Sequence, residues 1–343
     1  MFMDREGEHM QIMRIKRGVV IGLSAAFVSA GASALPFVIG DVLTSIGNSQ
    51  MKVFTQAGVL KQTLTATGAN AAFNDGMCVD GSGNVYQTGL NSGNVSKYDA
   101  NANLVNATYI TGVSRVESCL FNQAGEMFVG ISSSPNRILK YNVSGPTGTL
   151  VATYNTAAAT DWIELSSDQC TMLFTDESPI VRRHNVCTNT ALPNLTTIAG
   201  ATNLFAMRFL PTGEILAAGG NGVYKLSATG TVLLTWPRPN GGDLIFALNL
   251  DPDNVSFWTG SLTTFSVYKY NRATVTPPQV TFNAAANTEL GGLMIYGEQT
   301  AGGPGPGPGG PIFVPTLSEW TLIALSLMLA AFGLMAVYRM RRR

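Results

Sequence analysis

Short apolar runs separated by polar turns fill the chain between about residues 36 and 298. The runs are rich in β-branched and aromatic residues, and none shows the roughly 3.6-residue spacing of an amphipathic helix. Clusters of Gly, Asn, Asp, Ser and Pro bound them, as at residues 80–84 and 211–213. This pattern predicts an all-β body made of short strands and tight turns.

The strands recur with a period of 42 to 44 residues. Each period is marked by a basic residue, a large side chain that is usually aromatic, and a polar turn residue. The five copies are Lys97-Tyr98-Asp99, Lys140-Tyr141-Asn142, Arg183-His184-Asn185, Lys225-Leu226-Ser227 and Lys269-Tyr270-Asn271. A turn and a pair of β-rich segments precede each copy, so each period holds four strands. Four strands in about 40 to 45 residues are typical of a propeller blade.

The two ends of the repeat region complete a sixth blade. Residues 40–54 match the second to fourth strands of the repeat unit, whereas residues 293–296 match only a first strand. Pairing between them would close the ring and remove its exposed sheet edges. We therefore predict a six-bladed β-propeller over residues 35–300, closed by its N- and C-terminal strands.

The Asp/Asn-x-x-Gly turns, followed by a strand and motifs such as Lys97-Tyr98-Asp99, resemble those of NHL-like and gluconolactonase-like six-bladed propellers over residues 36 to 298. The resemblance implies a divalent cation near the propeller axis, held by acidic and Asn side chains.

The N-terminal segment is typical of a secretory signal peptide. Arg14, Lys16 and Arg17 precede an uncharged stretch, which ends in the small residues 31–34. We interpret residues 1–34 as a signal peptide with a leader before Met10 or Met13. The alternative is a buried N-terminal helix.

The C-terminal segment predicts a membrane anchor. Residues 320–338 carry no charge and are long enough for a transmembrane helix. A cluster of arginines follows and orients the body outward by the positive-inside rule: Arg339, Arg341, Arg342 and Arg343. Residues 301–313 alternate Gly and Pro and predict an extended linker between body and anchor. A buried core helix is the alternative for 320–338.

A short motif stands just before this predicted helix: Val314, Pro315, Thr316, Leu317 and, at the start of the apolar stretch, Trp320. Residues 314–343 thus contain this motif, then the apolar helix and then the arginine cluster. In this order they resemble the IPTL-CTERM protein-sorting domain of Gram-negative bacteria. The sequence departs at Val314, usually Ile, and at Thr321, usually Gly. The resemblance implies that an exosortase-like membrane enzyme reads the segment and that the helix is a temporary anchor.

Composition supports export and excludes one class of partner. Only 12% of the residues are charged, against about 25% in a typical soluble protein. Between Leu35 and Pro311 there are 13 Lys and Arg against 17 Asp and Glu, a net charge of −4. A body without a cationic surface does not favour nucleic acid as a partner.

The candidate chemistry is a set of acidic residues near the axis. Counting back from the turns places Asp75, Glu117 and Asp161 at equivalent starts of first strands in three consecutive repeats. The other blades offer Phe205, Phe246 and Gly291 at this position. We expect either a solvated channel mouth or a site for a divalent cation such as calcium, and without a metal the three carboxyls should raise one another's pKa values.

Four cysteines remain after export, which suggests two disulfides in an oxidising compartment. Three pairings are open. Strand placement favours Cys78 with Cys119, on neighbouring blades, and Cys170 with Cys187, within one blade.

We expect an exported monomer, held in the inner membrane with its body outside the cytoplasm and then processed to the cell surface or secreted. The body holds a single histidine, His184, in a strand motif, and no nucleophile elbow or zinc motif. The sequence therefore favours a non-enzymatic binding or surface-interaction module that takes an extracellular ligand. The alternative is a divalent-metal-dependent lactonase or related hydrolase centred on Asp75, Glu117 and Asp161.

Overall fold

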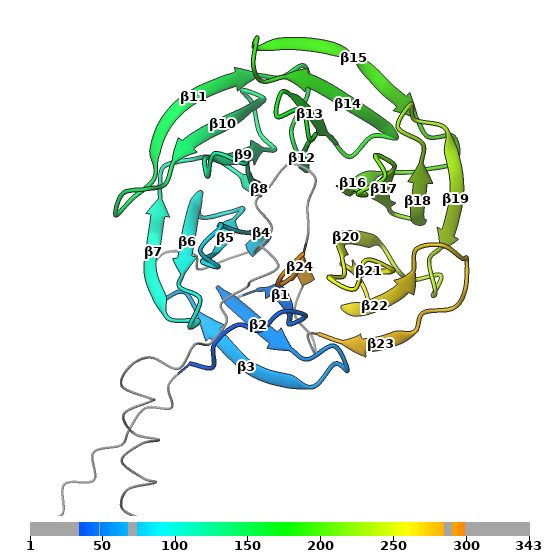
Figure 1. Cartoon of the computed structure of the whole chain (residues 1–343), viewed down its shortest axis with the longest axis horizontal. Helices are drawn as coiled ribbons and strands as arrows, with labels where there is room; N and C mark the ends of the chain where they lie inside the picture. The colour runs from blue at the N-terminus through cyan, green and yellow to red at the C-terminus, as the bar shows by residue number, and fades with distance from the viewer. Residues whose placement is uncertain (1–33, 48, 68–73, 285–289, 299–343) are drawn as a thin grey trace, which may run out of the picture. The chain divides into compact units, whose positions relative to one another are not determined.

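The computed structural model describes residues 34–298 apart from residue 48 and residues 68–73 and 285–289. In this part of the chain, six four-stranded antiparallel sheets stand around a central axis as the blades of a propeller (Figure 1). The prediction of an all-β, six-bladed propeller is confirmed. Across the described residues, no helix is long and apolar enough to cross a membrane.

Five blades follow the five sequence repeats, and we number them 1 to 5. Blade 1 contains β4 (Asn74–Val79), β5 (Val85–Gly89), β6 (Asn94–Tyr98) and β7 (Leu104–Ile110). Blade 2 contains β8 (Val116–Phe121), β9 (Met127–Ile131), β10 (Arg137–Asn142) and β11 (Thr149–Asn155). Blade 3 contains β12 (Ile163–Leu165), β13 (Thr171–Phe174), β14 (Ile180–Asn185) and β15 (Thr190–Thr197). Blade 4 contains β16 (Leu204–Phe209), β17 (Ile215–Gly219), β18 (Gly222–Leu226) and β19 (Val232–Pro237). Blade 5 contains β20 (Ile245–Leu250), β21 (Ser256–Ser261), β22 (Ser266–Asn271) and β23 (Val280–Asn283).

The closing blade joins the two ends of the propeller. Its strands are β24 (Leu290–Ile295), β1 (Val42–Ile46), β2 (Gln50–Phe54) and β3 (Leu60–Thr65), in that order. The innermost strand, β24, pairs antiparallel with β1, so that Val42 lies opposite Ile295. The predicted closure by N- and C-terminal strands is therefore confirmed.

Burial falls from the innermost strand of each blade to the outermost. In the closing blade every residue of β24 and of β1 is buried, whereas no residue of β3 is fully buried. Apolar side chains fill the space between neighbouring blades, as where Leu216, Trp236 and Phe257 pack together between blades 4 and 5. Because these contacts are close-packed, the ring is a rigid frame for side chains at its axis.

The repeated basic residue lies on the third strand of its blade. The four lysines contact the second strand or the residue just before it, whereas Arg183 donates from Nε to the carbonyl of Pro193 on β15. Lys140 forms an ion pair of 3.0 Å with Glu126, just before β9. The Lys97 ammonium lies 5.2 Å from the centre of the Tyr86 ring on β5. The motif that marks the repeat therefore stabilises contacts inside the blade.

His184 occupies the aromatic position of this motif in blade 3. Its ring is 2% exposed, lies 3.1 Å from the Asn189 side chain through Nε2, and packs edge-on against Tyr154. These contacts are those of a structural histidine in the core.

The four cysteines form two disulfides. Cys78 on β4 is bonded to Cys119 on β8, so the innermost strands of blades 1 and 2 are linked covalently. Cys170, just before β13, is bonded to Cys187 in the turn after β14. These are the pairs that strand placement favoured.

Several predicted segments lie outside the described residues. They are the signal peptide and leader up to residue 33, the linker at 301–313, the transmembrane helix at 320–338 and the sorting signal at 314–343.

Candidate functional site

The starts of the innermost strands lie side by side around one end of the axis. Gly76 of β4 approaches β8 so closely that a Cβ atom would lie 2.6 Å from the carbonyl oxygen of Glu117. In the same way, a Cβ atom on Gly292 of β24 would lie 2.0 Å from the carbonyl oxygen of Asp75. Only glycine permits these approaches. We call this end of the axis the mouth; its residues are Asp75, Glu117, Asp161, Phe205, Phe246 and Gly291.

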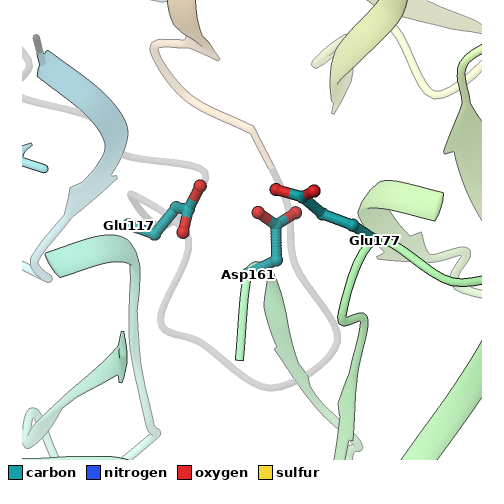
Figure 2. Close-up of side chains that lie close together, drawn as sticks. All are labelled: Glu117, Asp161 and Glu177. Carbon is teal, nitrogen blue, oxygen red and sulfur yellow. The ribbon is translucent and has the colours of Figure 1, made fainter. Parts of the chain in front are cut away.

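Three carboxyl groups converge at the mouth, and we call them the carboxylate triad. Glu117 lies on β8, Asp161 lies two residues before β12, and Glu177 lies in the loop between β13 and β14. One oxygen of each lies within 4.8 Å of the other two, and Figure 2 shows the three side chains pointing toward one another. Glu117 and Asp161 are 6% and 3% exposed, whereas Glu177 is exposed. The triad therefore reaches from the core to the surface of the mouth.

Burial and mutual repulsion raise the pKa values of the inner pair, Glu117 and Asp161. Burial raises the pKa of Asp161 well above its ordinary value, and the negative charge of Glu117 raises it further. Burial also raises the pKa of Glu117, although a hydrogen bond from Asp161 opposes that rise. Both carboxyls therefore hold a proton more tightly than free carboxyls do, as expected of close carboxyl groups without a metal.

Two oxygen atoms of this pair have no hydrogen-bond partner among the described residues. They are Oδ1 of Asp161 and Oε2 of Glu117, and both are inaccessible to solvent. A buried polar atom without a partner costs about 1 to 3 kcal/mol. Carboxylate oxygens are the ligands that calcium prefers, so a divalent cation would satisfy both atoms and remove the repulsion.

The structure brings together two of the three predicted metal ligands. Asp75 is 1% exposed on β4, and its negative charge contributes to the raised pKa of Asp161. It lies outside the group whose oxygens approach within 4.8 Å. Asp75 therefore adds negative charge to the mouth, while Glu117 and Asp161 bring their carboxylate oxygens together.

The opposite side of the mouth is aromatic. Phe205 on β16 and Phe246 on β20 occupy the positions equivalent to Asp75 and Glu117, and their ring centres lie 5.0 Å apart. The Phe205 ring is 5% exposed and that of Phe246 is partly exposed. The mouth thus presents carboxylates on blades 1 to 3 and an apolar wall on blades 4 and 5.

Glu177 is the triad member that repeat counting does not find, because it lies in a loop and not at the start of an innermost strand. The order of the strands could have indicated its position. In an antiparallel blade, the end of the second strand lies at the same end as the start of the first. Glu177 follows β13, the second strand of blade 3, so strand order alone places it at the mouth.

A second buried charged group lies where the innermost strands end, and we call it the base: Arg208, Glu164, Glu298 and Asn249. Arg208 on β16 donates from Nε to Glu298 at 2.7 Å and lies 3.6 Å from Glu164 on β12. Asn249 on β20 donates to the other oxygen of Glu298 at 2.7 Å. The base therefore ties blades 3, 4 and 5 to the segment that follows β24.

At the base, the negative charges of the carboxylates face the positive charge of Arg208 in the same chain. Burial raises the pKa of Glu164 to about 7, and the positive charge of Arg208 opposes that rise. The two carboxylates raise the pKa of Arg208, and its guanidinium also lies 4.6 Å from the Trp162 ring. No sequence motif indicated this group, since its members are up to 134 residues apart.

Comparisons with known proteins support the sorting motif and the propeller fold. Residues 314–343 match the IPTL-CTERM motif. Among solved structures, the chain is similar to Kuenenia stuttgartiensis hydrazine synthase, with 15% identity, a TM-score of 0.52, and coverage of 73% of this chain and 80% of that chain. At this identity the similarity shows the fold alone. The search of curated proteins gave no match.

The sorting motif and the two disulfides have a joint consequence. The IPTL-CTERM motif implies processing by a sorting enzyme, and disulfides form in oxidising compartments outside the cytoplasm. The chain is thus a β-propeller protein with an IPTL-CTERM sorting motif, which indicates an exported protein of the cell envelope.

Proposed function

We propose that this protein is a non-enzymatic binding module displayed at the cell envelope, and that its mouth holds a divalent cation such as calcium. The observation that carries the proposal is the carboxylate triad, in which two buried oxygens, on Glu117 and Asp161, have no hydrogen-bond partner among the described residues. The rigid ring supports it, because ligands on separate blades keep their spacing without a cation.

The cation would be held by oxygen atoms of Glu117, Asp161 and Glu177, with Asp75 adding negative charge nearby. Binding would lower the raised pKa values of Asp161 and Glu117 and so favour the loss of protons from the pair. A bound calcium ion accepts further oxygen ligands from sugars or carbonyl groups. Phe205 and Phe246 offer an apolar wall on the other side of the mouth, which suits the face of a sugar ring.

Export would use the two ends of the chain. The signal peptide at residues 1–34 would direct secretion, and an exosortase-like enzyme would recognise Val314–Leu317 before the transmembrane helix. The arginines at 339–343 would hold the body outside the cytoplasm until processing. A monomer released in this way would act at the cell surface or after secretion.

One observation favours a second function, a divalent-metal-dependent lactonase or related hydrolase. The Glu117 and Asp161 carboxyls have raised pKa values, and a carboxyl that titrates closer to neutral pH suits general acid or base catalysis. In that case one of these groups would move a proton beside the cation. The NHL-like and gluconolactonase-like resemblance supports this alternative as well.

Calcium titration of the full-length chain after chelator treatment tests the cation site. We expect one calcium ion to bind, with heat and proton release that Asp161→Asn abolishes. Asp168→Asn is the matched control, because Asp168 holds a turn of the same blade outside the mouth. No calcium binding by the wild type would refute the site.

Lactone hydrolysis and a glycan binding screen, each with and without calcium, separate the two functions. Calcium-dependent glycan binding without turnover supports the binding module. Hydrolysis that requires calcium and is lost in Asp161→Asn supports the hydrolase.

Sorting is tested separately in a host that carries the sorting enzyme. Replacing Pro315 and Thr316 with Ala should leave the full-length form in the inner membrane, as intact mass would show. Replacing the four terminal arginines with Ser should release unprocessed protein to the periplasm. If both variants behave as the wild type, the segment is an ordinary tail anchor.

A further inference from the structure

A groove lies between blades 1 and 2, on their outer strands. It encloses about 560 Å³, a volume typical of small-molecule sites. One wall is formed by residues 108–113 at the end of β7, and the other by alternate residues of β10 with residues 147–153 around β11. In Figure 1, the end of β7 points toward the end of β10 and the start of β11. No residue of the groove belongs to the carboxylate triad.

One charged side chain lines this groove. Arg137, Leu139 and Tyr141 alternate on β10, so they share the face of blade 2 that points toward blade 1. Leu139 and Tyr141 are buried in the apolar cluster that joins the two blades. Arg137 thus continues an apolar face and brings a guanidinium into the groove.

The Arg137 guanidinium has no acceptor among the described residues. Its Nε is inaccessible to solvent and makes no hydrogen bond, and no carboxylate of the described chain forms an ion pair with it. Burial raises the pKa of the Tyr141 hydroxyl, and the charge of Arg137 opposes that rise, which places the charge near the hydroxyl. The surroundings of Arg137 therefore supply hydroxyl groups but no negative charge.

This arrangement contrasts with two other arginines on the inner and middle strands. Arg208 pairs with Glu298, and Arg182 pairs with Asp176 at 2.7 Å. Arg137 is half-buried, and its Nε is closed off from the groove, so only the outer nitrogens of its guanidinium can meet a ligand there. A planar carboxylate can accept two parallel hydrogen bonds from a guanidinium, so an anion in the groove would supply the partner that the described chain does not.

The remaining lining indicates what else the ligand carries. Four threonines face the groove: Thr108, Thr111, Thr147 and Thr153. Hydroxyl groups both donate and accept hydrogen bonds, so they suit a ligand rich in hydroxyls. Leu150 and Ile110 supply apolar contacts between them.

We propose that the groove between blades 1 and 2 binds a hydroxylated carboxylate of the sugar-acid type, with the carboxylate on Arg137 and the hydroxyls on the threonines. This site is independent of the cation proposed for the mouth.

The test uses the full-length chain, with galacturonate as the probe and galactose as its neutral counterpart. Calorimetry should show galacturonate binding that is at least about tenfold tighter than galactose binding, because one charge-assisted pair is lost with galactose. Arg137→Gln should weaken galacturonate binding by at least about tenfold. Arg272→Gln, an arginine of blade 5 outside the groove, is the matched control and should bind as the wild type.

Folding and site identity need their own variants. Arg137→Gln should melt at about the same temperature as the wild type without ligand, because the half-buried Arg137 forms no ion pair with the described chain. If it fails to fold, Arg137→Lys keeps the charge without the fork and should still bind more weakly. Asp161→Asn should bind galacturonate as the wild type does, which separates this site from the mouth.

Three results would overturn the proposal. The first is unchanged binding in Arg137→Gln, and the second is galactose binding equal to that of galacturonate. The third is competition by acetate or inorganic phosphate at equal concentration, which would leave a simple anion contact and no sugar-acid site.

Discussion

The two ends of the propeller axis hold buried acidic side chains in opposite circumstances. At the base, Glu164 and Glu298 flank Arg208, and Glu298 also accepts from Asn249. At the mouth, Glu117 and Asp161 face each other and Glu177, and no lysine or arginine of the described chain forms an ion pair with them. The same kind of side chain is neutralised at one end and repelled at the other.

This difference distinguishes a structural group from a site. Charges that a chain neutralises internally hold its parts together, and removing one partner is costly. Charges that a fold keeps close without compensation reduce stability unless something from outside binds them. The base therefore supports the ring, whereas the mouth has the character of a ligand site.

The largest expected effect comes from Arg208→Met at the base. The variant leaves Glu164 and Glu298 buried without their cation, so the free energy of unfolding should fall by about 3 to 5 kcal/mol. Chemical denaturation measures it. Glu117→Gln is the matched change at the mouth and should be neutral or stabilising, because it removes a repelled charge.

A combined variant checks the cause of this loss. Arg208→Met together with Glu164→Gln and Glu298→Gln should recover much of the stability, since no buried charge then remains unpaired. A loss below about 1 kcal/mol in Arg208→Met alone would contradict the structural role of the base.

Calcium should produce the next largest effect, and only at the mouth. At one hundred times its dissociation constant, a ligand that binds only the folded state adds about 2.7 kcal/mol to the free energy of unfolding. We expect this gain in the wild type and in Glu164→Gln, but not in Asp161→Asn. Thermal melts with calcium and with a chelator measure it, and an equal gain in Asp161→Asn would disprove the assignment.

The pH dependence of the free energy of unfolding should contain one contribution from the base and one from the mouth. The folded-state pKa of Glu164, about 7, and that of Asp161 lie above their ordinary values, so the folded state binds more protons than the unfolded state. Each contribution is complete below the ordinary pKa and is lost as the pH rises through the folded-state value. Without calcium, the free energy of unfolding should therefore fall between about pH 4.5 and 7, by on the order of 1 kcal/mol or more.

Denaturation curves at several pH values measure this slope. Glu164→Gln should remove the part that belongs to the base, and Asp161→Asn the part that belongs to the mouth. Calcium should flatten only the second part. A slope that neither variant changes would show that other groups control it.

The sequence predicted the features that repeat and missed those that do not. The period of the Lys-Tyr motif located the blades, and the incomplete units at residues 40–54 and 293–296 predicted the closure by β1 and β24. Equivalent positions in the repeats also identified Glu117 and Asp161. A position count treats neighbouring blades alike, so it placed Asp75 with them, although its oxygens lie outside the triad.

The members of the base have no common sequence position. Arg208 meets Glu298 only because ring closure brings the segment after β24 beside β16 and β20. Such contacts depend on three-dimensional packing across 90 residues of sequence, which no local pattern encodes. The same holds for Arg137, whose missing acceptor is visible only once blades 1 and 2 are placed side by side.

The smallest expected effect on stability is that of Glu177→Gln. This variant tests whether Glu177 or the buried pair, Glu117 and Asp161, contributes most to cation binding. Glu177 is exposed and its charge is screened by water, so the free energy of unfolding should change by less than about 0.5 kcal/mol. Its charge raises the pKa values of Glu117 and Asp161, and both should move down toward their ordinary range in the variant. Titration followed by NMR of the carboxyl carbons measures that movement.

Calcium binding by Glu177→Gln should weaken but persist, because the two buried carboxyls remain. A tenfold loss corresponds to about 1.4 kcal/mol, and we expect a loss no larger than this. Complete loss of binding would show that the exposed carboxylate dominates, and that the buried pair at the mouth is structural like the base. Retention of binding with lowered pKa values would show instead that the buried pair is the ligand and that Glu177 tunes its charge.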